Sequence, residues 1–296
     1  MQEVYTLAEL EKLPRGVDLY GVVGFPVRHS LSPAFQNAAF RASGIKAEYV
    51  RVEVALDQLP EAIAKLKAAN FRGWNATLPH KIQLLNLVDE VDESAKKLGA
   101  VNTVLHQNGR LKGYNTDGAG WVKAVEEAFG VPLRSLRVMF LGAGGAGRAL
   151  AIQAAAAGCK RLFLANRTTG KAVELQKELA AYLPAESMSV LSLEERALAE
   201  ALLQTDLVVN CTALGLKDDD PEILPARLLR WDLLVYDTIY RRTKLIQAAE
   251  SVGARYANGL GMLLYQGALS WEIWTGRKAP MEIMRRALDA AASEQK

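Results

Sequence analysis

Short apolar runs alternate with longer stretches of helical periodicity along most of the chain. In the first half, runs rich in β-branched and aromatic residues predict strands at residues 19–24, 48–54 and 71–76. Residues 59–69 carry apolar side chains at helical spacing, and Asn108-Gly109 between two extended segments predicts a β-hairpin. Strands that alternate with helices indicate a largely parallel sheet covered on both faces.

The second half shows the same alternation more regularly. Short apolar runs predict strands at residues 137–141, 161–165, 188–191, 206–210 and 233–237. Helical periodicity at residues 148–157 and 171–182 fills the first two intervals between these strands. After Asn258 the pattern is helical to the end, with turn signals at Gly276 and Pro280. This spacing is typical of a doubly wound, nucleotide-binding α/β sheet.

Composition excludes several classes of protein. The chain has 296 residues, of which 50% are hydrophobic and 23% charged, with a formal net charge of +3. This balance indicates a globular protein of about two domains, and no segment is basic enough to predict binding to nucleic acid or to an anionic membrane. Two cysteines and three histidines without ligand spacing predict neither a disulfide framework nor a metal site. Because no apolar run reaches ~18 residues and the N-terminal segment is acidic, we expect a cytoplasmic protein.

A glycine-rich segment follows the strand predicted at residues 137–141. Gly142, Gly144 and Gly147 satisfy the pattern G-x-G-x-x-G, and a helix is predicted from Arg148. The first glycine of this motif permits a tight turn, the second lets the backbone approach a pyrophosphate, and the third lets the helix pack on the strand. The phosphates bind free N–H groups at the helix N-terminus. A purely structural turn is the alternative, but the strand–turn–helix context favours a dinucleotide site.

Cationic residues follow the next predicted strand. An NAD-binding unit places a carboxylate about 20 residues after the glycines, where it binds the ribose 2′-hydroxyl. This chain has Asn166, Arg167 and Thr168 instead, with Lys171 one turn later. An arginine pairs bidentately with a 2′-phosphate, which a carboxylate would repel. A solvated surface Arg and Lys are the alternative, but together with the missing acid the pattern favours NADP.

Polar residues of the first half are individually ambiguous. Ser30 is equally explained as a turn residue, and Ser32 as the N-cap of a helix that begins with proline. Taken alone, Lys81 is better explained as a solvent-facing charge on the next helix, and His80 beside it is expected to lie on the surface at a helix start. Asp117 is equally explained as the N-cap of a helix predicted over residues 117–129.

Taken in order, these segments resemble the shikimate dehydrogenase family. The resemblance runs from about Leu19 to the C-terminal helices and is carried by GFPVRHSLSP, NATLPHK, GAVNT, GYNTDG, GAGGAG, NRTTGK, NCTALGL, YDTIY and NGLGMLLYQGA. The family reduces 3-dehydroshikimate to shikimate with NADPH, the fourth step of the route to chorismate and the aromatic amino acids. The resemblance therefore implies an NADP-dependent oxidoreductase that acts on a CH–OH group.

The resemblance also implies roles for individual residues. Lys81 would be catalytic and would work beside Asp117. Both would also contact the substrate, together with Ser30 and Ser32 at its carboxylate, Tyr240 nearby, and Thr77, Asn102 and Gln266 at the ring hydroxyls. For the cofactor, the resemblance implies contacts at three places. The pyrophosphate would be bound by Gly142, Ala143, Gly144, Gly145 and Ala146, and the 2′-phosphate by Asn166, Arg167, Thr168 and Lys171. The nicotinamide would contact Thr238 and Gly259, and Glu93 would be a cofactor-proximal acid. No metal is implied, because a lysine can stabilise the developing oxyanion and deliver the proton.

The implied architecture has an α/β substrate domain and a Rossmann NADP-binding domain, with the active site in the cleft between them. We expect the substrate domain to be discontinuous, residues 1–116 and 259–296, and the NADP domain to span 117–258. The partner is a small-molecule substrate, and the protein is expected to be a monomer or a homodimer. Two alternatives stay open: a quinate/shikimate dehydrogenase that uses NAD, and a non-catalytic NADP-binding sensor with the same fold.

The chain departs from the family pattern in three places. Tyr240 is followed by Arg241 and Arg242, where the family often has a proline-containing segment. Cys211 replaces the commoner alanine close to the expected cofactor site. The acidic stretch 217–221 has no contact that the sequence assigns. None of these departures touches the residues implied for the substrate.

Overall fold

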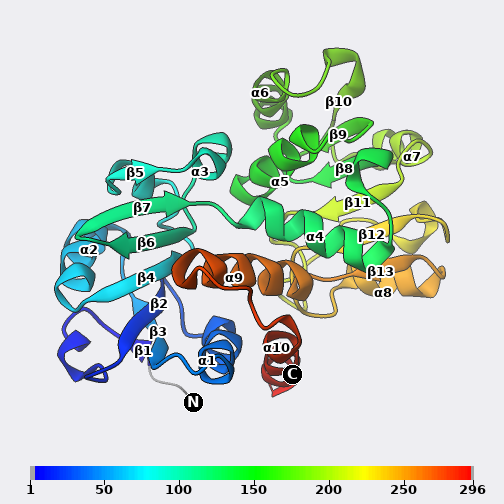
Figure 1. Cartoon of the computed structure of the whole chain (residues 1–296). Helices are drawn as coiled ribbons and strands as arrows, with labels where there is room; N and C mark the ends of the chain where they lie inside the picture. The colour runs from blue at the N-terminus through cyan, green and yellow to red at the C-terminus, as the bar shows by residue number, and fades with distance from the viewer. Residues whose placement is uncertain (1–3, 295–296) are drawn as a thin grey trace. The chain divides into compact units, whose positions relative to one another are not determined.

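A computed structural model describes residues 4–294, which form two units (Figure 1). The first unit comprises the chain up to Thr116 together with the residues from Leu264 onward, and the second comprises Asp117–Leu263. The sequence placed the return to the first unit at residue 259, five residues before this division. The division falls inside one continuous helix, α9 (Leu260–Thr275), so no turn or change of composition marks it in the sequence.

The first unit contains a mixed sheet. Its strands, in chain order, are β1 (Val4–Tyr5), β2 (Asp18–Gly24), β3 (Ala47–Glu53), β4 (Phe71–Ala76), β5 (Glu90–Val91), β6 (Thr103–Gln107) and β7 (Arg110–Tyr114). Among the described residues their spatial order is β1-β3-β2-β4-β6-β7-β5, and the pairs that involve β6 are antiparallel. The hairpin at Asn108-Gly109 is confirmed, with φ of 53° and 75° at the two residues, as a tight hairpin turn requires.

Helices in the first unit pack on this sheet or, for the last of them, on the first helix. They are α1 (Ser32–Ala42), α2 (Leu59–Ala68), α3 (Glu93–Leu98), the larger part of α9, and α10 (Met281–Glu294). Helix α9 approaches α1 at Gly267, where a Cβ would lie 2.4 Å from the Phe35 ring. The Gln36 amide donates to the Gly267 carbonyl at 2.9 Å, and the Trp274 indole N–H donates to the Val104 carbonyl at 2.9 Å. These contacts fix α9 against both α1 and β6.

The second unit contains an all-parallel sheet. Its strands are β8 (Arg137–Leu141), β9 (Arg161–Ala165), β10 (Met188–Leu191), β11 (Leu207–Asn210), β12 (Leu234–Asp237) and β13 (Arg255–Ala257). Their spatial order is β10-β9-β8-β11-β12-β13, and neighbouring strands pair in parallel throughout. This is the 3-2-1-4-5-6 order of a Rossmann sheet, so the predicted doubly wound fold is confirmed.

In the second unit one helix precedes these strands and four others connect them. They are α4 (Asp117–Phe129), α5 (Gly145–Ala156), α6 (Thr169–Leu179), α7 (Glu195–Leu202) and α8 (Lys244–Ser251). The strand order runs one way from β8 to β10 and the other way from β11 to β13, so right-handed crossovers place helices on both faces. The reversal lies between β8 and β11, and such sheets bind ligands at the carboxyl ends of the strands that flank this point.

No helix within residues 4–294 combines the length and the apolar character that crossing a bilayer requires.

Candidate active site

Ser30 and Ser32 lie in the turn between β2 and α1. Ser32 is the first residue of α1 rather than its N-cap, which is Leu31, so the capping interpretation of Ser32 is wrong. The backbone N–H of Ser32 donates to the Ser30 hydroxyl at 3.3 Å. The guanidinium of Arg51, on β3, donates to the Ser30 carbonyl through Nε at 3.1 Å and Nη2 at 2.6 Å. Arg51 therefore fixes this turn, and burial lowers the pKa of its guanidinium from the usual value.

Behind this turn lies a buried network of hydroxyls and amides. The Asn75 amide, on β4, donates to the Asn102 carbonyl at 3.1 Å, to the Thr103 hydroxyl at 3.0 Å and to the Ser270 hydroxyl at 2.9 Å. Its carbonyl oxygen accepts from the Tyr49 hydroxyl at 2.8 Å. All five residues are buried. Because both its amide nitrogen and its carbonyl oxygen are hydrogen-bonded, Asn75 holds two strands and α9 in one arrangement.

Asn102 and Gln266 come together at the edge of this network. The Asn102 amide donates to the Thr116 hydroxyl at 2.9 Å and lies 3.5 Å from the Gln266 side-chain oxygen. Its own carbonyl oxygen accepts from the Thr116 backbone N–H at 2.8 Å and from the Thr103 hydroxyl at 2.8 Å. One turn further along α9, Ser270 donates to the Gln266 carbonyl at 2.9 Å. Both predicted substrate residues are therefore oriented by neighbours that the sequence did not single out.

Thr77, His80 and Lys81 lie in the turn after β4. His80 is fully buried, so its predicted surface position is wrong. Its Nε2 lies 2.8 Å from the Val54 carbonyl, which can only accept, so Nε2 carries the proton. Nδ1 has no partner among the described residues, and burial lowers the His80 pKa below its usual 6.5. The imidazole attaches this turn to the chain that leaves β3.

Lys81 is half-buried, and its carbonyl accepts from the Val101 N–H at 2.8 Å. Residues 78–82 form turns instead of a helix, so Lys81 is not a charge on a helix surface. Thr77 is also half-buried and packs on Gly24, where a Cβ would lie 2.3 Å from its methyl group. The motif therefore keeps Lys81 in a braced turn at the carboxyl end of the sheet.

Asp117 and Tyr240 belong to the second unit. Asp117 is half-buried and is the first residue of α4, so its interpretation as an N-cap is wrong. Tyr240 is 46% exposed and ends the turn that follows β12, where its carbonyl accepts from the Asn258 amide at 3.0 Å. Glu93, by contrast, belongs to the first unit; it begins α3, is exposed, and pairs with Lys96 at 2.6 Å.

The glycine turn joins β8 to α5. Gly142 has φ of +100°, in the region that favours glycine, and a Cβ there would lie 2.9 Å from the Thr212 methyl group. At Gly147 a Cβ would lie 1.9 Å from the Gly142 carbonyl oxygen, so no side chain fits. At Gly144 and Gly145 nothing lies within 4 Å. The open side of the turn, next to N–H groups that lack intrahelical partners, fits a pyrophosphate.

Residues 166–171 follow β9 beside this turn. The Asn166 carbonyl oxygen accepts from the Ala143 N–H at 3.0 Å, and its amide donates to the Thr168 carbonyl at 2.8 Å. Asn166 thus braces the glycine turn with its side chain. Arg167 and Lys171 are exposed, and neither makes an ion pair within the described part of the chain. Two uncompensated cations at the end of β9, with no carboxylate, fit a 2′-phosphate.

Two further loops leave the carboxyl ends of β11 and β12, and the first of them packs on the glycine turn through Cys211 and Thr212. Thr238 donates from its hydroxyl to the Asn210 carbonyl at 2.8 Å, and a Cβ at Gly259 would lie 2.1 Å from the Thr238 carbonyl oxygen. Cys211 precedes Thr212, and burial raises the pKa of its thiol, so the thiol stays protonated at neutral pH. Cys211 therefore acts here as a packing residue next to the turn.

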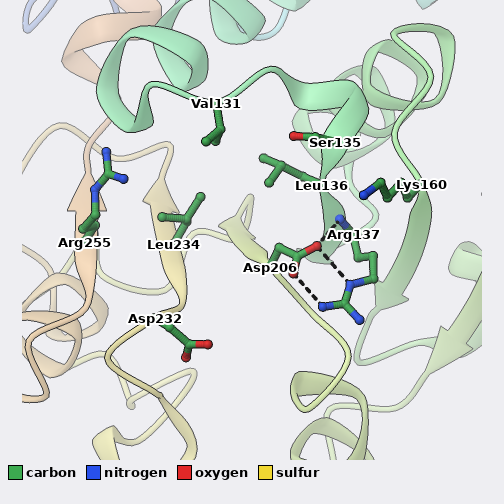
Figure 2. A pocket seen from close by; sticks show the side chains of 9 residues that line it. All are labelled: Val131, Ser135, Leu136, Arg137, Lys160, Asp206, Asp232, Leu234 and Arg255. Atoms are coloured by element: carbon green, nitrogen blue, oxygen red, sulfur yellow. Dashed lines mark hydrogen bonds and ion pairs between the residues drawn. The ribbon is translucent and has the colours of Figure 1, made fainter.

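A separate hollow of about 560 Å³ lies at the opposite end of this sheet (Figure 2). It contains none of the predicted site residues, and its walls come from the amino-terminal ends of the strands. Figure 2 shows Arg137 paired with Asp206, at 3.0 Å through Nε and 2.6 Å through Nη2. Arg255 in its wall donates to the Ala128 carbonyl at 3.1 Å. These charges are satisfied within the protein, and parallel sheets bind ligands at the other end.

Comparison with known proteins decides the family. Residues 22–104 match the model of the shikimate dehydrogenase substrate binding domain, residues 123–216 that of shikimate/quinate 5-dehydrogenase, and residues 259–288 that of the shikimate 5′-dehydrogenase C-terminal domain. A shikimate dehydrogenase (NADP(+)) of Dehalococcoides mccartyi is 42% identical over 94% of this chain and 97% of its own length. The chain belongs to the shikimate dehydrogenase family.

Other relatives extend this finding. A shikimate dehydrogenase (NADP(+)) of Moorella thermoacetica is 44% identical over 92% of this chain and 93% of its own length. The crystal structure of the Thermus thermophilus shikimate 5-dehydrogenase, in complex with NADP(H) and shikimate, is 36% identical and superposes with a TM-score of 0.82. That match covers 93% of this chain and all of the other. The family predicted from the sequence is thereby confirmed.

Proposed function

We propose that the protein is a shikimate dehydrogenase, which reversibly reduces 3-dehydroshikimate to shikimate with NADPH. The observation that carries the proposal is the buried network in which Asn102 and Gln266, 164 residues apart in the chain, lie side by side. A small polyhydroxylated acid exposes little apolar surface, so its orientation depends on fixed hydrogen-bonding groups. This network provides such groups and holds them before the substrate binds.

The substrate is held by the first unit. The hydroxyls of Ser30 and Ser32 bind its carboxylate, and Thr77, Asn102 and Gln266 bind ring hydroxyls. Arg51 supports the carboxylate site through the Ser30 carbonyl. Asp117 and Tyr240 of the second unit complete the set that the resemblance implies.

The cofactor that the second unit fits is NADPH, which would supply the hydride when bound. The glycine turn binds its pyrophosphate through backbone N–H groups, and Arg167, Thr168 and Lys171 bind its 2′-phosphate. Thr238 and Gly259 line the nicotinamide site. Glu93 stays a prediction as a cofactor-proximal acid, since its carboxylate pairs with Lys96 in the structure.

Lys81 acts at the reacting carbonyl. As negative charge develops on that oxygen, the Lys81 ammonium stabilises it and donates the proton that makes the hydroxyl. For Asp117, the resemblance implies a part in the same step, as the acceptor from a substrate hydroxyl. His80 hydrogen-bonds the Val54 carbonyl and so fixes the turn that carries Lys81.

The test is steady-state kinetics on four pairs: shikimate or quinate as substrate, each with NADP or NAD. We expect the highest kcat/KM for shikimate with NADP. A highest value for quinate with NAD would contradict the proposal and favour a quinate dehydrogenase. No turnover with any pair, together with measurable NADPH binding, would favour the non-catalytic sensor.

A further inference from the structure

Two loops that leave the carboxyl ends of β11 and β12 are tied together. The first, residues 211–220, includes Thr212, which packs on Gly142 of the glycine turn. The second, residues 238–243, includes Thr238, which packs on Gly259. Under the proposed function, both loops border the nicotinamide half of the cofactor. Their relative geometry therefore bears directly on how the hydride donor is held.

A buried carboxylate joins the two loops at their base. Asp237 is fully buried and accepts from the Asn210 amide at 3.1 Å, from the Thr243 hydroxyl at 2.7 Å and from the Ile239 N–H at 3.0 Å. Asn210 in turn accepts from the Thr212 N–H at 3.0 Å and hydroxyl at 2.8 Å. Burial raises the Asp237 pKa, while the hydrogen bonds oppose that shift. The conformation of this part of each loop is therefore fixed by buried hydrogen bonds.

The outer part of the first loop has a different support. Arg241, in the second loop, donates through Nη1 to the Leu216 carbonyl at 2.6 Å and pairs through Nη2 with the Asp218 carboxylate. Lys244 donates to the Asp220 carbonyl at 2.6 Å. The acidic stretch to which the sequence assigned no contact is thus bound by Arg241, at a position where the chain departs from the family pattern, and by Lys244 on α8.

We propose that Arg241 is a positioning residue for the cofactor. By binding Leu216 and Asp218 at once, it fixes the 211–220 loop against the 238–243 loop before the dinucleotide arrives. A loop that is already ordered loses less conformational entropy when a ligand binds, so the cofactor binds more tightly. The inference rests on the proposed function. It concerns the nicotinamide half and is independent of the 2′-phosphate.

Arg242 provides a matched control. It is the next residue, is also exposed, and pairs with Glu250 on α8 instead of with the first loop. Arg242→Ala therefore removes the same side chain and an exposed ion pair without releasing the loop. Because Arg241 is 48% exposed and the Asp237 network stays intact, we expect Arg241→Ala to fold normally.

The experiment measures equilibrium dissociation constants for NADPH and NADH by nucleotide fluorescence, with the thermal midpoint as a stability check. We expect Arg241→Ala to raise both constants by the same factor, about threefold to tenfold, as for an exposed contact of about 1 kcal/mol. Asp218→Ala should have a smaller effect, since the bond to Leu216 remains, and Arg241→Lys should be intermediate. The KM for shikimate should not change.

Equal constants for Arg241→Ala and Arg242→Ala would overturn the inference, and so would a loss confined to NADPH. The proposed function fails separately, if the unaltered protein binds NADPH but does not reduce 3-dehydroshikimate. In that case the binding comparison of the two arginine variants still decides whether Arg241 positions the dinucleotide.

Discussion

The two halves of the candidate site are built in opposite ways. In the first unit, the residues proposed for the substrate rest on buried side chains that hydrogen-bond one another, with Asn75 and Ser270 at the centre. In the second unit, the groups proposed for the phosphates of the cofactor are largely exposed: Gly144 and Gly145 on the open side of the glycine turn, and the cations Arg167 and Lys171. One half relies on side chains fixed by packing, and the other on backbone and charge.

This difference follows from the ligands. A small ring with several hydroxyls is recognised by the directions of the hydrogen bonds that its hydroxyls make. Each protein group that makes such a bond must therefore be held in place by further hydrogen bonds. A pyrophosphate and a 2′-phosphate are recognised mainly by charge, which backbone N–H groups and mobile cations provide with looser geometry. Substitutions in the first half should therefore change catalysis and stability, and those in the second mainly cofactor affinity.

The largest effect is expected from Lys81→Ala. Loss of the proton donor should lower kcat by ~10²–10⁴-fold with a smaller change in KM. Lys65→Ala, which removes an exposed lysine paired with Glu61, is the control. An unchanged kcat in steady-state assays of the Lys81 variant would remove this residue from the mechanism.

Arg167→Ala tests the cofactor half. We expect the KM for NADPH to rise ~10–100-fold, as for a lost charge-assisted contact with a phosphate, while the KM for NADH stays the same. The comparison needs both cofactors at saturating substrate. An equal rise for both would mean that Arg167 does not recognise the 2′-phosphate.

Substitutions at two glycines of the glycine turn distinguish an effect on packing from an effect on ligand binding. Gly147→Ala should lower the free energy of unfolding by ~1–3 kcal/mol, because its Cβ would meet the Gly142 carbonyl. Gly144→Ala should leave stability unchanged, because its Cβ would point into open space, and should weaken NADPH binding. Urea unfolding and fluorescence titration of both variants distinguish these outcomes; equal stabilities would be inconsistent with the close approach at Gly147.

Ser270→Ala tests the buried network. Removing its hydroxyl leaves the Asn75 amide without one acceptor, so we expect a loss of ~1–2 kcal/mol of stability and a higher KM for shikimate. Ser293→Ala is the control, since Ser293 makes a similar bond to the carbonyl four residues earlier on an exposed helix face. Equal behaviour of the two variants would show that the network does not orient the substrate site.

The smallest effect concerns pH. Burial lowers the His80 pKa, so the unfolded chain binds more protons than the folded protein below pH 6.5. Stability from this group is fully present above that pH and falls as the pH drops below it. We expect His80→Gln, which keeps an N–H donor for Val54, to flatten this dependence in urea unfolding from pH 7 to 5. Identical slopes would refute a buried, neutral His80.

Much of the second unit could be predicted from the sequence. Strands β8, β9 and β10 have the predicted bounds, because each is a short apolar run between polar turns. Helix α5 begins at Gly145, three residues earlier than expected, because two of the glycines in the turn already belong to it. The short strand β13 was not predicted, since its three residues carry no apolar run.

The substrate half could be predicted only in part. The motifs indicated Asn102 and Gln266, but not Thr103, Thr116 and Ser270, which orient them. A signal exists for Ser270, a polar residue one turn after Gln266 in an apolar helix. His80 was expected on the surface because its segment was interpreted as a helix start. Its burial depends on a tertiary contact with Val54, which no local pattern encodes.

The central claim is that residues of the first unit bind the substrate and residues of the second unit bind the cofactor. Its most direct test is calorimetric titration of NADPH and of shikimate, separately, into Ser32→Ala and Arg167→Ala. We predict that Ser32→Ala loses affinity for shikimate and binds NADPH normally, whereas Arg167→Ala does the reverse. A loss of NADPH affinity in the Ser32 variant, or of shikimate affinity in the Arg167 variant, would contradict the account.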